Sequence, residues 1–295
     1  MTDEPDLTDT VPWRAFVKEA ERRLTSAGLE HAAAEARWLV EEAAGFGPGD
    51  LAVRSDELAT VRGVRRFDDM ISRREVGEPI QYVLGHWPFR HLDLLVDRRV
   101  LIPRPETELV AGRALELLAA APARPRVVDL GTGSGAIGLS VLAEHDTAEV
   151  WMTDVSPEAL AVARANLAGL GRRATRGSIA QGSWFEALDD ALRGSIDLVV
   201  ANPPYVADDD VLDASVVDWE PQSALFAPSA GLADLEEVVR SSVDWLRPGG
   251  HLVVEHGRDQ SAAVVEMFLA AGHVDVRANS DLAGLHRFVD GRLPG

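Results

Sequence analysis

The chain has 295 residues, of which 46% are hydrophobic, so it is long enough for two domains and a sizeable core. It contains no cysteine, which excludes disulfides, cysteine-ligated zinc and catalysis by a thiolate. With 29 Lys and Arg against 48 Asp and Glu, the net charge is −19, and the lack of a basic stripe argues against direct binding to a nucleic-acid backbone.

The chain begins with ten acidic, threonine-rich residues, which we expect to be frayed. This start lacks the apolar segment of a signal peptide, and no apolar run approaches the roughly 18 residues of a membrane span. No cluster of His, Asp and Glu has the spacing of metal ligands. We therefore expect a soluble, cytoplasmic protein without a membrane or metal site, and we expect it to act as a monomer.

A helical region follows. Its first helix is predicted from apolar residues at positions i, i+3, i+4, i+7 and i+11, namely Trp13, Phe16, Val17, Ala20 and Leu24. Gly28 ends this helix, a second is predicted for His31–Ala44, and one or two more lie within Asp56–Glu75. We expect residues 1–78 to form a small all-α domain that either docks a protein substrate or covers a cleft.

Residues 79–100 are predicted to form a β-hairpin linker. Gln81–Gly85 and Leu92–Val96 have the composition of short strands, with Pro88 between them. The run Leu101–Glu108, with the sequence Leu-Ile-Pro-Arg-Pro-Glu-Thr-Glu, comes next. Its two prolines favour an extended entry, and a helix is predicted to begin at Glu106 or Thr107.

Strands and helices alternate regularly in the rest of the chain, 101–295. The predicted strands are Arg126–Leu130, Glu149–Asp154, Thr175–Gln181, Ile196–Ala201, His251–Glu255, Val274–Ala278 and Leu285–Val289. The predicted helices between them are Ala136–Ala143, Pro157–Leu167, Leu232–Leu246 and Asp259–Ala271. This alternation predicts an α/β fold with a mostly parallel seven-stranded sheet. The last strand follows a tight connection, so we expect it to insert antiparallel.

A glycine-rich loop joins the first of these strands to its helix. The loop and its flanking residues are Asp129, Leu130, Gly131, Thr132, Gly133, Ser134 and Gly135. Glycines let the backbone approach a ligand closely, and the helix N-terminus offers free N–H groups. Gly133–Gly138 also matches the dinucleotide fingerprint, with Asp154 about 20 residues further on. The carboxylate of Asp129 beside the loop, however, suits the amino group of S-adenosylmethionine better than a pyrophosphate.

Two further residues of this half are candidates for the same ligand. Asp154 ends the second strand, where it either accepts hydrogen bonds from ribose hydroxyls or caps the helix that starts at Pro157. Trp184 follows the third strand, where it either stacks on an adenine ring or belongs to the core. For the loop itself, the alternative is a tight strand-to-helix turn with no ligand.

The most informative motif is a tetrapeptide that follows the buried strand Ile196–Ala201. Pro203 and Pro204 have fixed φ and no N–H, so the chain that leaves the sheet is stiff and keeps free carbonyl oxygens. Asn202 adds an amide oxygen, and Tyr205 adds a flat ring. The four residues are suited to hold a planar –NH2 group. The alternative is a proline-rich strand exit with a half-buried tyrosine.

Three more segments carry the resemblance to a known family. They are Gly77–Gly85 (Gly-Glu-Pro-Ile-Gln-Tyr-Val-Leu-Gly), Leu101–Glu108 and Glu220–Leu225 (Glu-Pro-x-x-Ala-Leu). Together with the glycine loop, the tetrapeptide and the helical N-terminus, they resemble the HemK-type peptide chain release factor N5-glutamine methyltransferases over nearly the whole chain. The resemblance implies a Rossmann-like, class I S-adenosylmethionine-dependent methyltransferase domain at 101–295.

The resemblance also implies a reaction and a site. The reaction is methylation of the side-chain nitrogen of glutamine in the Gly-Gly-Gln motif of class 1 release factors. The implied cofactor contacts are Gly131–Gly135, Asp154, Trp184 and Asn202, and the implied substrate clamp is Asn202–Tyr205. Ser183 stands where family members often carry an aspartate that binds adenine, so it offers a hydrogen bond without a charge. Arg104 and Glu106 either support the loop over the cofactor or form a surface ion pair.

Several alternatives remain open at this point. A ribosomal-protein glutamine methyltransferase would use the same chemistry on another partner. An adenine-N6 DNA methyltransferase would need a basic surface, which the charge of −19 argues against. An NAD-dependent oxidoreductase and a non-enzymatic domain that retains the cofactor loop are the remaining possibilities. His86, His251 and His256 could be catalytic, but lone histidines are more often structural.

Overall fold

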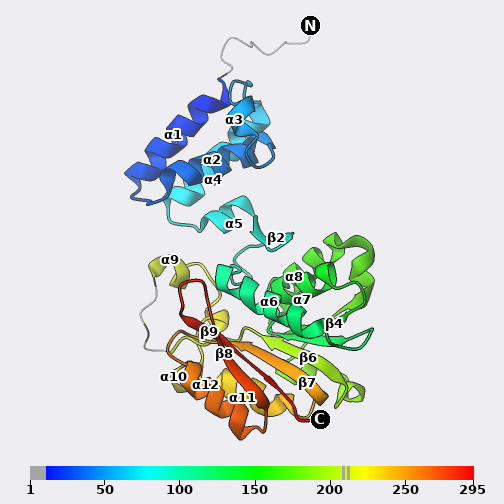
Figure 1. Cartoon of the computed structure of the whole chain (residues 1–295). Helices are drawn as coiled ribbons and strands as arrows, with labels where there is room; N and C mark the ends of the chain where they lie inside the picture. Colours follow the sequence, from blue (N-terminus) through cyan, green and yellow to red (C-terminus); the bar gives the residue numbers. More distant parts are fainter. Residues whose placement is uncertain (1–10, 208–209, 211–212) are drawn as a thin grey trace. The chain divides into compact units, whose positions relative to one another are not determined.

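The computed structural model describes residues 11–207, 210 and 213–295. The chain divides into two compact units, Met1–Gly85 and His86–Gly295 (Figure 1). The predicted frayed segment, residues 1–10, lies outside the described residues. Within the described ranges, no helix combines the length and the apolar character that crossing a lipid bilayer requires.

The first unit is helical and packs around an aromatic core. Its helices are α1 (Trp13–Ser26), α2 (Ala32–Ala44), α3 (Leu51–Arg54), α4 (Val61–Glu75) and α5 (Ile80–Leu84). The buried face of α1 carries Trp13, Phe16 and Leu24 at the predicted helical spacing. The ring of Phe16 lies 5.3 Å from that of Trp13 and 5.1 Å from that of Phe67 on α4, centroid to centroid. The predicted helices therefore form because one apolar stripe on each meets the others.

The capping residues explain where these helices start and stop. Gly28 has a φ of 80° just after α1, as predicted, and Gly45 has a φ of 69° at the end of α2. The hydroxyl of Thr60 accepts the N–H of Gly63 at 3.1 Å, so α4 begins at Val61. The range predicted to hold one or two helices thus contains one, and the short α3 lies before it.

The predicted strand Gln81–Gly85 is wrong, because this segment is the helix α5. Arg73 at the end of α4 donates hydrogen bonds to the carbonyls of Tyr82, at 2.9 Å, and Val83, at 3.5 Å, which satisfies the last turn of α5. Gly85 then ends the helix with a φ of 82°. The local composition favoured a strand, and the side chain from the neighbouring helix overrides it.

A buried ion pair joins α2 to α4. Arg74 donates from Nε and Nη2 to the two carboxylate oxygens of Glu35, at 2.7 and 3.1 Å. The two side chains are only 12% and 7% exposed. Arg74 also donates from Nη1 to the carbonyl of Glu78 at 3.0 Å, so the pair ties both helices to the chain that enters α5.

The second unit begins with a two-stranded ribbon, β1 (His86–Phe89) and β2 (Leu92–Leu95), paired antiparallel. The predicted hairpin is therefore present, but its first strand lies later in the chain than predicted. Pro88 is part of that strand, opposite Asp93, instead of lying in the turn. A proline is tolerated there because the ribbon has only two strands and both are edges.

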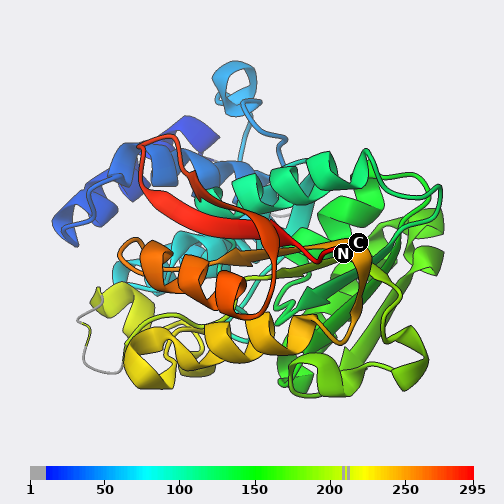
Figure 2. The same cartoon turned by 60° about the horizontal axis from the view of Figure 1, so that its bottom comes forward.

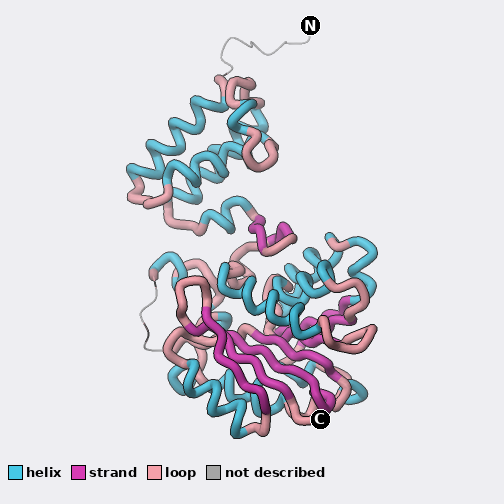
Figure 3. The backbone as a smooth tube through the Cα atoms, in the orientation of Figure 1, coloured by secondary structure: helices cyan, strands magenta, loops and turns pink. Residues whose placement is uncertain are grey.

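A seven-stranded sheet forms the centre of this unit, which confirms the predicted Rossmann-like α/β class (Figure 3). Its strands are β3 (Arg126–Leu130), β4 (Glu149–Asp154), β5 (Gly177–Gln181), β6 (Ile196–Ala201), β7 (Leu246–Glu255), β8 (Val274–Ser280) and β9 (His286–Arg292). The spatial order is β5-β4-β3-β6-β7-β9-β8. The pairs from β5 to β7 are parallel, and β9 inserts antiparallel between β7 and β8, as predicted.

Helices cover both faces of this sheet (Figure 2). The helices of this unit are α6 (Pro105–Leu118), α7 (Ala136–Glu144), α8 (Pro157–Gly169), α9 (Ala214–Val217), α10 (Pro228–Gly231), α11 (Ala233–Ser242) and α12 (Ser261–Ala270), with short 3₁₀ turns η2 (Gly171–Arg176), η3 (Trp184–Ala187), η4 (Asp190–Leu192) and η5 (Gln222–Ala224). Helices α6 and α7 pack together on one face, and α11 and α12 pack together on the other. The all-buried strand β6 runs between these two layers.

Most predicted boundaries in this unit are confirmed within a few residues, and the end of α11 and the start of β7 differ more. Strand β5 begins at Gly177 instead of Thr175, because residues 171–176 form the 3₁₀ turn η2. Strand β7 begins at Leu246 instead of His251, so the predicted helix Leu232–Leu246 ends earlier, at Ser242. Pro248, Gly249 and Gly250 hid the first half of β7 from the sequence pattern.

The ion pair in the first unit generates a testable expectation. Replacing Glu35 with alanine leaves the nearly buried guanidinium of Arg74 without its partner, so E35A should lower the free energy of unfolding by about 3–5 kcal/mol. Chemical denaturation of the full chain, followed by circular dichroism, measures this change. The matched control is E30A, since Glu30 is exposed and its loss should change the same quantity by less than about 0.5 kcal/mol. Equal effects of the two substitutions would contradict the expectation.

Candidate active site

A cavity of about 260 Å³ lies in the second unit where the carboxyl ends of β3, β4, β5 and β6 meet. The strand order reverses here, because β4 and β5 lie on one side of β3 and β6 lies on the other. Ligands of open α/β sheets bind at such a switch point. The volume is close to the lower end of the roughly 300–1,000 Å³ typical of ligand pockets.

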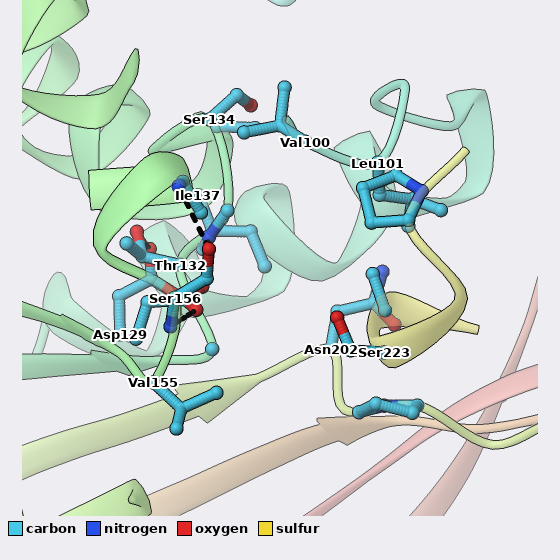
Figure 4. Close-up of a pocket in the computed structure, with 18 of the residues that line it drawn as sticks. Val100, Leu101, Asp129, Thr132, Ser134, Ile137, Val155, Ser156, Asn202 and Ser223 are labelled. Carbon is cyan, nitrogen blue, oxygen red and sulfur yellow. Dashed lines mark hydrogen bonds between the residues drawn. The ribbon is translucent and has the colours of Figure 1, made fainter. Parts of the chain in front are cut away.

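Most of the residues predicted for the site line this one cavity. They are Asp129, Gly131, Thr132, Gly133, Ser134, Asp154, Ser183, Trp184, Asn202 and Pro204. Figure 4 shows Asn202 and Ser223 on one side of the cavity and Asp129 and Thr132 on the other. Gly135, Pro203 and Tyr205 are not part of the lining. Gly135 is the N-cap of α7, with a φ of 89°, Pro203 is buried, and Tyr205 is half-buried next to the cavity wall.

The glycine loop is held by one oxygen of Asp129. Its Oδ2 accepts the hydroxyl of Thr132 at 2.5 Å and the N–H of Gly138 at 2.9 Å. A β-carbon at Gly138 would lie 2.9 Å from this oxygen and 2.7 Å from Met152, so glycine is required for the close approach. The other oxygen, Oδ1, is buried and has no hydrogen-bond partner. A lining carboxylate with one free buried oxygen is suited to a positively charged ligand group.

The environment of Asp129 raises the pKa of its carboxyl group. Burial raises its pKa to about 7, and the charge of Asp154 adds to that shift, while the hydrogen bonds from Thr132 and Gly138 oppose it. A cation placed at Oδ1 would favour the charged carboxylate. Binding of a cation there would therefore release a proton from Asp129.

Asp154 links the end of β4 to the glycine loop. Its Oδ2 accepts the N–H of Gly133 at 2.9 Å, and its Oδ1 accepts the N–H of Ser156 at 2.9 Å. The helix α8 is capped instead by Ser156, whose hydroxyl accepts the N–H of Ala159 at 3.1 Å. Asp154 thus lines the cavity with a carboxylate that orders the loop, and it is not the helix cap.

Trp184 lies against the loop and also against the core. An ideal β-carbon on Gly131 would be 3.3 Å from its ring, so the ring packs on the glycine backbone. The Trp184 side chain hydrogen-bonds to Asp234, and its carbonyl accepts the hydroxyl of Thr153 at 3.3 Å. Its backbone has a φ of 47°, which is uncommon for a large residue. Trp184 therefore packs against core side chains, as one alternative predicted, and it also lines the cavity, while stacking on an adenine ring stays a prediction.

The polar side chains after β6 are held by hydrogen bonds to Thr107, which also lines the cavity, and to the buried Glu255. Asn202 donates from Nδ2 to the hydroxyl oxygen of Thr107 at 3.3 Å, and Thr107 donates to the carboxyl of Glu255 at 2.8 Å. Tyr205 donates from its hydroxyl to the other oxygen of Glu255 at 3.4 Å. The sequence predicted Glu255 as the last residue of a strand but assigned it no role.

Two segments far apart in the sequence meet on another wall. Glu220, which is buried, accepts the N–H of Ile102 at 2.9 Å and a guanidinium N–H of Arg104 at 2.6 Å. Pro103 and Pro221 beside them line the cavity. Arg104 therefore pairs with Glu220, not with an exposed neighbour, and this pair holds the Leu101–Glu108 run against the cavity.

Sequence reasoning did not find Val100, Val155, Ser223 and Asp234, which also line the cavity. Val155 could have been found, because it directly follows the carboxyl end of β4. Asp234 lies in the first turn of α11, and no local pattern places that turn beside the glycine loop.

The histidines lie away from the lining. His256 is fully buried and donates from Nδ1 to the carbonyl of Gly257 at 2.8 Å, His86 pairs with Asp93, and His251 lies on β7. Burial lowers the pKa of both His251 and His256, so both are neutral at pH 7. Within the described ranges, no three His, Asp or Glu side chains are grouped as metal ligands.

Comparison with known proteins identifies relatives over nearly the whole length. The family models "PrmC N-terminal domain" and "Methyltransferase small domain" match residues 15–85 and 111–218. A release factor glutamine methyltransferase of Burkholderia pseudomallei is 40% identical over 267 residues, which cover 89% of this chain and 93% of that protein. Another, from Bifidobacterium longum, is 36% identical over 287 residues, which cover 93% of this chain and 97% of that protein.

A solved structure supports the fold. The crystal structure of a methyltransferase from Pyrococcus furiosus aligns with 70% of this chain and 91% of its own, with a TM-score of 0.50 and 15% sequence identity. At this identity the likeness concerns the fold alone.

The raised pKa of Asp129 generates a prediction about stability. The folded protein holds this proton more tightly than the unfolded chain does, so the contribution of Asp129 to the free energy of unfolding falls as pH rises from about 4 to about 7. In D129N the contribution is absent. The difference in unfolding free energy, wild type minus D129N, should therefore fall by roughly 2–3 kcal/mol between pH 5 and pH 8. Urea denaturation of both ligand-free proteins at several pH values measures it, and a constant difference would show that burial does not control this carboxyl.

Proposed function

The chain belongs to the release factor glutamine methyltransferases, and from that premise we propose that it methylates the side-chain amide nitrogen of glutamine in the Gly-Gly-Gln motif of class 1 peptide chain release factors. The methyl donor in this proposal is S-adenosylmethionine. The observation that supports it best is that Asn202 and Pro204 line the same cavity as the glycine loop, so an acceptor held by the tetrapeptide would lie beside a ligand held by the loop.

The residues of the cavity fit S-adenosylmethionine, whose sulfonium activates its methyl group for transfer to a nucleophile. The free Oδ1 of Asp129 would accept the amino group, and the backbone of Gly131–Gly135 would lie along the methionine part. Asp154 would accept the ribose hydroxyls. Ser183 and Trp184 would hold the adenine ring, with the hydroxyl of Ser183 in place of the aspartate that the resemblance leads one to expect.

The same carboxylate argues against a dinucleotide. The pyrophosphate of NAD is anionic, and a buried carboxyl with a free oxygen at the loop would repel it. An ammonium group has the opposite charge and three N–H donors. The charge at Asp129 thus favours the binding of S-adenosylmethionine over that of NAD, and hence a methyltransferase over an oxidoreductase.

The tetrapeptide would hold the acceptor. A carboxamide nitrogen is a poor nucleophile, because its lone pair is delocalised into the carbonyl group. The Oδ1 of Asn202 and the carbonyl of Pro203 would each accept one N–H of the glutamine amide, and Tyr205 would pack on its plane. These acceptors favour the positive charge that develops on nitrogen, and the rigid prolines hold them in place before the reaction. Positioning of this kind can contribute about 7–11 kcal/mol.

No dedicated general base is needed in this scheme. The glutamine nitrogen gains the methyl group and loses one hydrogen as a proton, which leaves to water or through the Asn202 contact. The cavity lining has no histidine, the carboxyls of Asp129 and Asp154 are already engaged with the glycine loop, and the carboxyl of Asp234 hydrogen-bonds to Trp184. The residues of the site therefore act by orientation and electrostatics.

The remaining parts of the proposal concern the partner. We propose that the helical domain, residues 1–78, docks the release factor, and that residues 79–100 link it to the methyltransferase domain, 101–295. The protein would act as a cytoplasmic monomer on a factor of translation termination, with no direct contact to nucleic acid or membrane.

The decisive experiment is mass spectrometry of a purified class 1 release factor after incubation with this protein and S-adenosylmethionine. We expect a gain of one methyl group, mapped to the glutamine of Gly-Gly-Gln. A release factor with that glutamine replaced by alanine is the control and should gain none. A purified ribosomal protein methylated in its place would favour the sister activity, and no methylation of either protein would refute the proposal.

Asn202 provides a prediction for the rate. N202A removes one of the two acceptors for the glutamine amide, so kcat should fall roughly 10²–10³-fold. The dissociation constant for S-adenosylmethionine should change much less. Steady-state methylation and calorimetry measure the two quantities. N279A is the matched control, because Asn279 lies on β8 and does not line the cavity, and it should retain wild-type kcat. Full activity of N202A would exclude the proposed clamp.

Asp129 provides a prediction for the methyl donor. D129N should weaken binding of S-adenosylmethionine at pH 8 by at least about tenfold, because a charge-assisted hydrogen bond to the amino group is lost. Wild-type affinity should itself fall as pH drops below about 7, where Asp129 becomes protonated, and D129N should lack this dependence. Calorimetry with S-adenosylmethionine and, separately, with NADH measures both effects; tight binding of NADH would support the oxidoreductase instead.

A further inference from the structure

We propose that Glu255 is a positioning residue for methyl transfer: with Thr107, it sets the direction in which the Asn202 amide faces, and it anchors Tyr205. This inference rests on the proposed function, in which Asn202 and Tyr205 hold the glutamine. Glu255 does not line the cavity, so it would act through those two residues and not on the substrate.

Each carboxylate oxygen of Glu255 accepts one hydrogen bond from a hydroxyl group. Oε2 accepts the hydroxyl of Thr107 at 2.8 Å, and Oε1 accepts the hydroxyl of Tyr205 at 3.4 Å. Thr107 in turn accepts Nδ2 of Asn202 at 3.3 Å. The four residues come from three separate elements: the first turn of α6, the loop after β6 and the last residue of β7. One carboxyl thus connects the two polar side chains of the tetrapeptide.

The direction of this chain of hydrogen bonds follows from the charge of Glu255. A carboxylate only accepts hydrogen bonds, so the single hydroxyl hydrogen of Thr107 points to Glu255. The oxygen of Thr107 then has only lone pairs left, and it must receive a donor. Asn202 therefore presents its NH2 group to Thr107 and keeps Oδ1 for the cavity side, where the proposed function needs an acceptor.

Tyr205 is held by the same end of β7 in a second way. An ideal β-carbon on Gly257 would lie 3.5 Å from the Tyr205 ring, so the ring packs on that backbone. Gln260 donates from Nε2 to the carbonyl of Tyr205 at 2.9 Å and accepts the N–H of Gly257 at 2.8 Å. Glu255, Gly257 and Gln260 together fix the hydroxyl, the ring and the backbone of Tyr205.

Protonation of Glu255 would exchange donor and acceptor roles in the hydrogen bonds that join Glu255, Thr107 and Asn202. Its carboxyl is fully buried, and burial raises its pKa to about 7. The charge of Glu106 on α6 adds to this shift, whereas the hydrogen bonds from Thr107 and Tyr205 and the charge of Arg287 on β9 oppose it. Burial and the charge of Glu255 raise the pKa of Tyr205 well above its usual range, so its hydroxyl keeps its proton and donates. A protonated Glu255 could donate to Thr107, which would free the threonine hydrogen for Oδ1 of Asn202.

The substitution E255Q imitates that state without changing the shape. The glutamine amide can donate to Thr107, so the Asn202 side chain is free to adopt the reversed orientation. We expect kcat for release-factor methylation to fall about tenfold, the loss of roughly one net hydrogen bond, with the KM for S-adenosylmethionine nearly unchanged. T107V, which removes the connection, should lower kcat to a similar extent, whereas T107S, which keeps the hydroxyl, should retain it within about threefold.

The pH dependence distinguishes positioning from a loss of structure. At saturating S-adenosylmethionine, wild-type kcat should decline below about pH 7, as Glu255 gains its proton. E255Q should have no such decline, because its side chain does not titrate. Circular dichroism and calorimetric binding of S-adenosylmethionine verify that each variant is folded. The control is E149Q at the amino end of β4, which should keep wild-type kcat and its pH profile.

The outcomes separate this inference from the proposed function. If the wild-type protein methylates glutamine while E255Q and T107V retain its kcat and its pH profile, the positioning role is refuted and the function stands. If the wild-type protein does not methylate glutamine, the proposed function itself fails. A T107S variant as slow as T107V would also overturn the role of the hydroxyl.

Discussion

The pairing of β6 with β3 is the constraint on which the site depends. Asp129 lies opposite Val200 and Leu130 opposite Ala201 in this parallel pair, so the two chains leave the sheet at the same edge. The glycine loop continues from one strand, and Asn202 follows directly on the other. Because both chains turn away from each other at this point, a cavity remains between them. A methyl donor and an amide acceptor would thus meet without either segment having to move far.

Three buried carboxyls lie around this cavity, and only one of them has a cationic partner. Glu220 is paired with Arg104, whereas Asp129 and Glu255 have only hydroxyl and backbone donors. Burial without a cationic partner explains why the pKa of both Asp129 and Glu255 is raised to about 7. Such groups do not favour folding near neutral pH. Their presence fits the proposed roles, in which Asp129 binds a cation and Glu255 orients an amide. Functional sites commonly contain groups that lower the stability of the fold.

Much of the architecture follows from local patterns. The strand Ile196–Ala201 is entirely apolar except for Asp197, and the helix at Pro157 begins with a proline at its first position, so both could be recognised from the sequence. The segment Gln81–Gly85 could not, because its conformation depends on hydrogen bonds from Arg73 on another helix. The first half of β7 was missed for a related reason. Its proline and two glycines do not favour a strand locally, and pairing with the neighbouring strand decides its state.

The amino-acid sequence alone determined the class of fold, the glycine loop and the Asn-Pro-Pro-Tyr tetrapeptide, because each depends on residues that are close together in the chain. The tertiary structure decided which distant side chains support them. Thr107 and Glu255 are 148 residues apart, and Ile102 and Glu220 are 118 apart, yet each pair shares a hydrogen bond beside the cavity. No periodicity or motif specifies such contacts. They arise only when the sheet brings the ends of its strands to one edge and the first turn of α6 packs against that edge.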